Sequence, residues 1–392
     1  ALSGRLNSVR GVLPVAVQAR AAGRGLVIPS ANGPEAALAG GGSQLCADSL
    51  LAVVSWLHGR TTLPQAETSP KPPTSGFKDL ADVRGQEQAR RALEVAAAGN
   101  HNILFSGPPG TGKTMLASRL PGILPPLSAG EALDAAAVAS VSQAGLDMER
   151  WSTRSFRAPH HTASSAALVG GGSRPRPGEI SLAHHGVLFL DELPEFNRDV
   201  LEVLREPLES GRIIISRAAC FAEFPARFQL VAAMNPCPCG YHGDKSGRCR
   251  CTSEQVQRYR GRISGPLLDR IDLHIQMSRP GQVLFSDSSP ASESSEAVRH
   301  RVEMARERQL RLFGRPSAQL DSAGVRRHCR LKPPLRDILE QAAEQMALSP
   351  RAVQRILKVA RTVSDLRGKD QIGEQQLAEA LAYRGIDCGN HP

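Results

Sequence analysis

Nearly continuous apolar runs alternate with helical segments through the middle of the chain. The runs at residues 102–105, 186–190 and 228–233 have the composition of strands that are buried on both faces. Helical segments precede and separate these runs, the first near residues 86–98. The alternation predicts an α/β core with a parallel sheet and helices on both faces of that sheet.

The pattern differs before this core. Residues 1–60 mix short apolar runs with glycine and small residues and end in a helical run at 50–57, which indicates a small α/β unit. Residues 61–76 are rich in proline and poor in apolar residues, so we predict a linker there.

The pattern also differs after the core, which we place at residues 77–280. Residues 281–296 are rich in serine and predict a flexible connection. Residues 297–392 predict an entirely helical domain. Its clearest helices are expected at 335–346, 350–366 and 374–383.

Composition and charge restrict the class of protein. The 392 residues are 41% hydrophobic and 22% charged, as expected for a soluble protein of two or three domains without a membrane span. The eight cysteines do not form a secreted framework, so we expect a reducing, cytoplasmic location. The start lacks both a methionine and a signal peptide, which suggests a fragment. The net charge of +10 favours a nucleic acid partner, although it could serve solubility alone.

A phosphate-binding loop directly follows the first buried run. Its glycines let main-chain N–H groups approach phosphates, Lys113 reaches the β and γ oxygens, and Thr114 binds Mg²⁺. A chance glycine turn is the alternative, and the preceding strand argues against it. The predicted nucleotide-binding residues are Gly107, Pro108, Pro109, Gly110, Thr111, Gly112, Lys113 and Thr114.

Polar residues follow the next two buried runs. Asp191 and Glu192 end the second run, and ligands bind at the carboxyl ends of strands in parallel sheets. Asp191 is expected to hold Mg²⁺ through water and Glu192 to polarise the attacking water. Asn235 ends the third run and could orient the same water, or it could be an ordinary capping residue.

A cysteine cluster begins two residues after Asn235. Cys237, Cys239, Cys249 and Cys251 form two C-x-C pairs, and four thiolates can close a tetrahedral Zn²⁺ site. The commoner spacing is C-x₂-C, His242 could replace one ligand, and two disulfides or free thiols are the alternatives. A metal-stiffened loop here would couple the nucleotide site to DNA or to a neighbouring subunit.

These motifs resemble those of a known family over essentially the whole chain. The phosphate loop, Asp191-Glu192, Asn235 and the stretch 268–272 occur in the order found in AAA+ ATPases. The chain is similar to the magnesium-chelatase-like branch, in particular to its ComM/YifB family. The segments that carry this closer resemblance are 155–161, 177–184, 235–240 and 355–361.

The resemblance implies a P-loop AAA+ core, a helical lid domain and an ATP hydrolase that uses Mg²⁺ and assembles into a hexameric ring. Arg270 would be the arginine finger that completes the ATP site of a neighbour, and Arg351 would be the second sensor in the lid. For Arg270, a salt bridge to Asp269 or Asp272 is the alternative.

The resemblance also implies an ATP-driven DNA motor, a helicase for branch migration of recombining DNA during natural transformation (competence). The alternative is the ATPase motor subunit of a metal-chelatase complex. Aromatic content is only 4%, so we expect backbone contacts with branched or single-stranded DNA. A predicted hairpin at 211–226 and a basic loop at 151–178 would make these contacts, unless their charges are simply solvated. Their candidate residues are Arg212 and Arg217, and Arg154, Arg157, His160, His161, Arg174 and Arg176.

Residues 4–58 resemble the second half of a Lon-protease-like domain. The segment that matches the catalytic lysine element, residues 13–20, contains no lysine, so we expect a degenerate and non-proteolytic piece. Without its first half, this piece is expected to be poorly ordered.

Overall fold

The structure is a computed structural model that describes residues 3–67, 76–172, 175–217, 220–244, 247–279 and 293–384. Half of the predicted linker at 61–76 and most of the predicted connection at 281–296 lie outside the described residues. Arg174 and the side chain of Arg217 also lie outside them.

A five-stranded sheet organises the middle of the chain, in the order β11-β3-β10-β7-β4. All neighbouring strands are parallel, which confirms the predicted sheet. Every residue of β3, β7 and β10 is buried, which explains the continuous apolar runs. The strands are β3 (Ile103–Ser106), β4 (Phe156–Arg157), β7 (Val187–Leu190), β10 (Gln229–Met234) and β11 (Leu273–Gln276).

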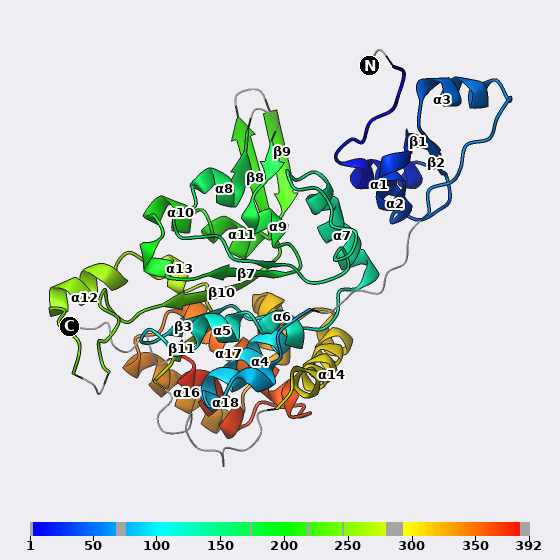
Figure 1. The fold of residues 1–392 in the computed structure, drawn as a ribbon. Coiled ribbons are helices and arrows are strands. Elements are labelled where there is room, and N and C mark those ends of the chain that lie inside the picture. Colours follow the sequence, from blue (N-terminus) through cyan, green and yellow to red (C-terminus); the bar gives the residue numbers. More distant parts are fainter. Residues whose placement is uncertain are drawn as a thin grey trace.

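Alternate side chains along the strands belong to two separate hydrophobic cores, one on each face of the sheet. Ile103 and Phe105 belong to one core and Leu104 to the other, because successive side chains of a strand point to opposite faces. Helices therefore cover both faces of the sheet, as predicted (Figure 1). One face carries α4 (Glu87–Gly99), α14 (Ser295–Phe313), α17 (Pro350–Leu366) and α18 (Glu374–Ala382), and the other carries α9 (Glu179–Leu182), α10 (Arg198–Glu202), α11 (Arg205–Ser210) and α13 (Gly265–Leu268).

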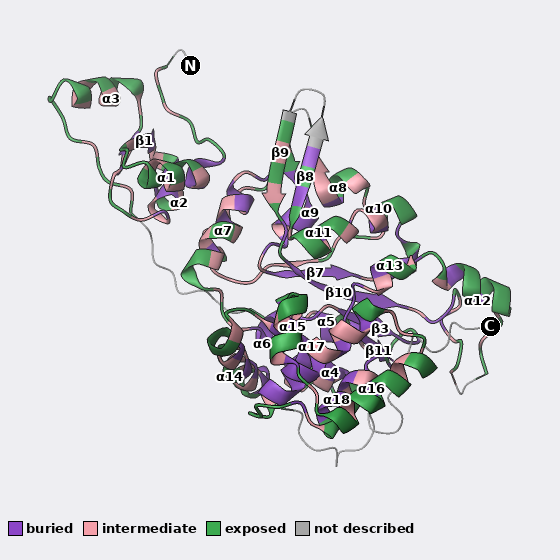
Figure 2. Ribbon diagram, turned by 180° about the vertical axis from the view of Figure 1, so that it is seen from behind, coloured by how far each residue is buried: buried purple, intermediate pink, exposed green. Residues whose placement is uncertain are grey.

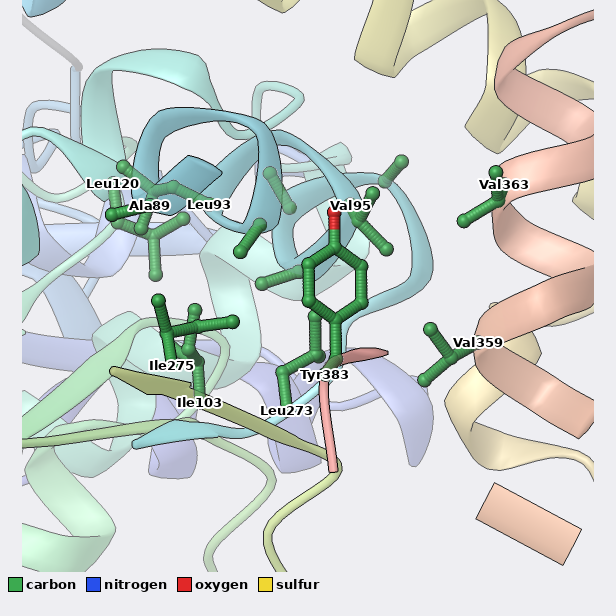
Figure 3. Close-up of a cluster of buried hydrophobic side chains, with 14 of the residues drawn as sticks. Ala89, Leu93, Val95, Ile103, Leu120, Leu273, Ile275, Val359, Val363 and Tyr383 are labelled. Carbon is green, nitrogen blue, oxygen red and sulfur yellow. The ribbon is translucent and has the colours of Figure 1, made fainter. Parts of the chain in front are cut away.

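The first core joins the sheet to the C-terminal helices. Figure 3 shows α4 and α17 facing β3 and β11 across a layer of aliphatic side chains and one tyrosine. Burying each such aliphatic side chain stabilises the fold by about 1.5–3 kcal/mol. The labelled members are Ala89, Leu93, Val95, Ile103, Leu120, Leu273, Ile275, Val359, Val363 and Tyr383.

The C-terminal region is helical, as predicted. The helix α17 begins where Ser349 Oγ accepts a hydrogen bond from the Ala352 N–H at 3.2 Å. The helix α14 begins at Ser295, inside the predicted flexible connection, because Ser294 caps it by accepting from Ala297 N at 3.3 Å. The other helices here are η5 (Ser317–Gln319), α15 (Ser322–His328) and α16 (Pro333–Gln345).

The N-terminal residues form a small α/β unit that packs on the helix α7 (Ala129–Ser140). Leu13 is fully buried in a core of its own, which Ala136 of α7 completes. The predicted α/β character is therefore correct, whereas the helix α3 exposes most of its surface (Figure 2). The elements are α1 (Val12–Ala21), β1 (Leu26–Pro29), η1 (Ser30–Asn32), α2 (Gly33–Ala37), β2 (Gln44–Ala47) and α3 (Leu50–Leu57).

An antiparallel hairpin precedes β10 and extends away from the sheet (Figure 1). It pairs β8 (Arg212–Arg217) with β9 (Cys220–Pro225), which confirms the predicted hairpin. The remaining elements are η2 (Leu80–Asp82), α5 (Lys113–Ala117), α6 (Leu120–Ile123), α8 (Ser165–Val169), β5 (Gly170–Gly171), β6 (Arg176–Pro177), η3 (Leu193–Glu195) and α12 (Ser253–Arg260).

Candidate active site

The glycine-rich loop lies at the carboxyl edge of the sheet, between β3 and α5. Gly107 packs so closely on the chain after β11 that a Cβ atom would lie 2.4 Å from Met277 O, so no other residue fits. Gly112 has a φ of 88°, and a Cβ there would meet open space. The loop is therefore fixed by packing on one side and open on the other.

Lys113 projects back over this loop. Its Nζ donates to Gly107 O at 2.6 Å, to Pro108 O at 3.0 Å and to Asn235 Oδ1 at 3.1 Å. Burial lowers the pKa of Lys113 below its usual value, and the charges of Asp191 and Glu192 partly offset this effect. The structure thus brings the loop lysine and the predicted Asn235 into direct contact.

Thr114 and Asp191 meet between the loop and the end of β7. Thr114 Oγ1 donates to Asp191 Oδ2 at 2.6 Å, and Asp191 Oδ1 accepts from Glu192 N at 2.9 Å. A hydroxyl and a carboxylate are the oxygen ligands that Mg²⁺ prefers. The donor set therefore fits the metal that the phosphate loop implies.

Glu192, two residues after β7 ends, takes a left-handed backbone conformation with a φ of 53°. This conformation is uncommon for a non-glycine residue and occurs at functional sites. Glu192 Oε2 lies 3.2 Å from His161 Nδ1, in the loop between β4 and α8. The pair is partly exposed, with 50% of the Glu192 side chain and 31% of the His161 side chain accessible.

Arg270 lies at the opposite, amino edge of the sheet. Its carbonyl oxygen accepts from Asn102 Nδ2 at 3.2 Å, just before β3 begins. Gly107 is five residues further along the chain, which corresponds to about 16 Å of extended strand. Arg270 is therefore remote from the phosphate loop of its own subunit.

Glu209 binds both candidate arginines. Arg270 Nη2 donates to Glu209 Oε1 at 2.5 Å, and Arg351 Nη1 lies 3.7 Å from the same oxygen. Burial lowers the pKa of Arg270, and the charge of Glu209 opposes that shift. The expected alternative partner Asp272 instead accepts from Arg355 Nη1 at 2.5 Å. Both arginines thus contact Glu209, away from Lys113, but the Arg270 side chain is only 7% accessible, whereas that of Arg351 is 69% accessible.

Two arginines of the basic loop at 151–178 bind groups elsewhere in the protein. Arg154 donates to Pro125 O and His185 O, both at 2.6 Å. Arg157 binds both carboxylate oxygens of Glu179 at 2.7 Å. These guanidinium groups hold the loop in place and are poor candidates for DNA phosphates.

Other candidate DNA contacts remain on the surface. Arg176 is exposed. Arg212 is exposed on the hairpin and lies 3.3 Å from Glu223. An ion pair this exposed is weak, so Arg212 is free to bind a phosphate instead.

The four predicted cysteines converge. All four Sγ atoms lie within 4.8 Å of one another, and none of these cysteines forms a disulfide. Cys237 is fully buried, and the other three are partly buried.

Sequence reasoning missed two partners of the site. Glu209 ends a surface helix, and no motif distinguishes it from other acidic residues. His161 was considered only for DNA binding, and its contact with Glu192 spans a long loop. Neither pairing has a local spacing that could have predicted it.

Comparisons with known proteins agree with this geometry. The family model described as magnesium chelatase, subunit ChlI, matches residues 79–283, and its C-terminal counterpart matches residues 292–384. Competence protein ComM of Haemophilus influenzae is 49% identical over 98% of this chain and 76% of its own length. A YifB protein of Salmonella typhimurium is 48% identical over 99% of this chain and 76% of its own length.

More distant relatives carry the chelatase name itself. The magnesium-chelatase 38 kDa subunit of Cereibacter sphaeroides is 25% identical over 51% of this chain and 59% of its own length.

Among the described residues, no helix has the length and apolarity needed to cross a bilayer.

Proposed function

Since this chain belongs to the magnesium chelatase ChlI family, alongside the ComM and YifB proteins, we propose that it is a ring-forming ATPase that moves DNA. The observation that supports ATP hydrolysis best is the contact set at the carboxyl edge of the sheet. There, Lys113 meets Asn235, and Thr114 meets Asp191. Three separate segments, at the start of α5 and after β7 and β10, bring these polar groups together beside an open glycine-rich loop.

Each residue of this set has a separate task. Lys113 moves from loop carbonyls to the phosphate oxygens of ATP, and main-chain N–H groups of residues 107–114 bind the same phosphates. Thr114 and Asp191 would hold Mg²⁺, which neutralises charge on the phosphates when it is bound. Glu192 takes a proton from the attacking water, and Asn235 helps to orient that water.

The location of the arginines supports a ring. Arg270 and Arg351 lie at the amino edge of the sheet, whereas the phosphate loop lies at its carboxyl edge. The length of the strands thus separates Arg270 from the phosphate loop of its own subunit. We therefore propose that both arginines stabilise charge on the γ-phosphoryl group of ATP bound by a neighbour, in a hexamer.

Mixing subunits tests this arrangement. Lys113→Ala and Arg270→Ala chains should each be inactive on their own. Mixed rings should regain hydrolysis at sites where the intact phosphate loop of an Arg270→Ala chain adjoins the intact Arg270 of a Lys113→Ala chain. A mixture of Lys113→Ala with Glu192→Gln is the matched control, because every site then lacks one loop-side residue. Equal rates in the two mixtures would refute the shared site.

The proposed DNA activity is supported by the net charge of +10 and by the exposed hairpin β8–β9, which carries Arg212. The competence protein among its relatives supports DNA as the partner as well. DNA binding through phosphates predicts weak sequence preference and a steep salt dependence. The proposed core at 77–280 and lid at 297–392 are supported by the two separately matched segments.

The decisive measurement is the ATPase rate with and without forked or four-way DNA at two salt concentrations. A DNA motor should hydrolyse faster with DNA, and less so at high salt. Arg212→Ala should weaken DNA binding and lower the salt slope by about 1, whereas Arg258→Ala, an exposed arginine on α12, should change neither. A rate that ignores DNA would favour the second candidate, a chelatase-type motor subunit, to which the family description points.

A further inference from the structure

The cysteine cluster has the dimensions of a metal site. The Sγ atoms of Cys237 and Cys239 lie 3.3 Å apart, those of Cys237 and Cys249 3.9 Å, and those of Cys239 and Cys249 3.7 Å. Zn–S bonds of about 2.3 Å place the corners of a ZnS₄ tetrahedron about 3.8 Å apart. Cys251 Sγ lies within 4.8 Å of the other three.

The surrounding main chain is arranged for thiolates. The His242 N–H donates to Cys237 Sγ at 3.3 Å, and such a bond stabilises negative charge on sulfur. Gly240, with a φ of 84°, lets the chain turn directly after Cys239. The exposed residues Arg248 and Arg250 flank Cys249 and would partly balance the charge of four thiolates.

We propose that Cys237, Cys239, Cys249 and Cys251 bind one structural Zn²⁺. Four protein thiolates fill a tetrahedral shell and leave no position for a reacting water, so the ion stabilises the loop and does no chemistry. We call residues 236–244 and 247–251 the cysteine knuckle.

The knuckle packs against the phosphate loop of the nucleotide site. A Cβ atom on Gly240 would lie 2.7 Å from Pro109 Cδ, so the knuckle and the phosphate loop are in close contact. Asn235, which contacts Lys113, leads directly into the knuckle. Arg260 Nε donates to Pro236 O at 3.1 Å and ties the same turn to α12.

A second attachment joins the knuckle to the end of β11. Arg279 pairs with Asp244 at 3.4 Å, and its guanidinium carbon lies 5.2 Å from the centre of the Tyr241 ring. The knuckle therefore contacts the loop, Asn235 and the chain after β11 at once. The zinc ion, by holding this turn together, keeps Asn235 and the phosphate loop in place, and this role rests on the proposed ATP site.

Metal content is tested on the full chain, independently of ATP. Elemental analysis of the purified protein should find one zinc per chain. Cobalt that replaces the zinc should show the visible absorption of a tetrahedral tetrathiolate site. The double variant Cys249→Ser/Cys251→Ser should lose the metal, whereas Cys46→Ala, a buried cysteine of the N-terminal unit, should keep it. A folded wild-type chain that binds neither metal would overturn the site.

The positioning role has its own readout. Chelation of the zinc from the wild-type chain should weaken ATP binding about fivefold, the equivalent of one lost hydrogen bond of about 1 kcal/mol, and returned zinc should restore it. Circular dichroism should remain unchanged, which separates this effect from unfolding. Unchanged ATP affinity in the metal-free chain would refute the positioning role. Absence of ATP binding in the zinc-loaded chain would instead refute the proposed function.

Discussion

The contact between His161 and Glu192 predicts how DNA controls ATP hydrolysis. His161 belongs to the basic loop at 151–178, for which the sequence predicts DNA contact, and its Nδ1 lies 3.2 Å from the carboxylate expected to activate water. While this contact holds, one carboxylate oxygen of Glu192 is occupied by the imidazole of His161. DNA that draws the loop aside would release the carboxylate. We therefore expect His161→Ala to raise the ATPase rate without DNA.

The size of the effect follows from the exposure of the pair. With 50% and 31% of the two side chains accessible, the contact resembles a surface pair worth about 0.2–1 kcal/mol. Removing it shifts the population of free Glu192 by about 1.4-fold to fivefold. The basal rate should rise by at most that factor. The rate at saturating DNA should stay at the wild-type value, because DNA has already broken the contact.

The assay is steady-state ATP hydrolysis at increasing concentrations of forked DNA. His160→Ala is the matched control, since the His160 ring lies tilted beside His161, with the ring centroids 4.1 Å apart, and its Nδ1 contacts Thr162 and not Glu192. The control should keep both the basal rate and the DNA stimulation. If His161→Ala lowers the basal and the DNA-stimulated rates equally, the histidine supports catalysis and does not restrain it, and the argument fails.

Three further predictions concern catalysis and stability. Glu192→Gln should lower kcat about 10²–10⁴-fold and retain ATP binding, measured by turnover and by nucleotide titration. His184 is buried with a pKa of about 3, and its Nδ1 accepts from Arg227 N at 3.0 Å, so the folded chain excludes a proton that the unfolded chain binds. The free energy of unfolding should therefore fall by about 2 kcal/mol from pH 7 to pH 5. The variant His184→Asn should lack this pH-dependent difference, measured by urea titration at both pH values. Burial alone would raise the pKa of Asp272, but the charge of Arg355 holds it well below its usual range. Asp272→Asn should consequently cost about 3 kcal/mol or more of unfolding free energy at neutral pH, measured by urea titration.

Much of the fold could be predicted because its signals are local. The buried strands appear as unbroken apolar runs, and the phosphate loop directly follows one of them. The start of α14 could not be placed, because a serine-rich stretch favours a linker and also supplies Ser294 as a helix cap. Local composition there supports two structures, and tertiary packing of α14 on α4 decides between them.

The candidate site was predictable only in part, for a related reason. Asp191 and Asn235 were expected near Lys113, because parallel strands end at the same edge of a sheet. The pairing of Arg270 with Glu209 joins residues that are far apart in the sequence, so it depends on how α11 and α13 pack. Charge alone had suggested Asp269 or Asp272 as partners, and both were wrong.

The arrangement of the lid explains how the two edges of the sheet can work together. Asp272 lies two residues after Arg270, and it is bound by Arg355 of α17, the helix that also carries Arg351. A movement of α17 would therefore be transmitted to the position of Arg270 through a buried ion pair. Because Arg270 and Arg351 are proposed to serve a neighbour's ATP, a lid shift in one subunit would alter hydrolysis in the next. Such coupling between adjacent subunits is what sequential firing around a ring requires, and the Asp272–Arg355 pair is the contact where it can be interrupted.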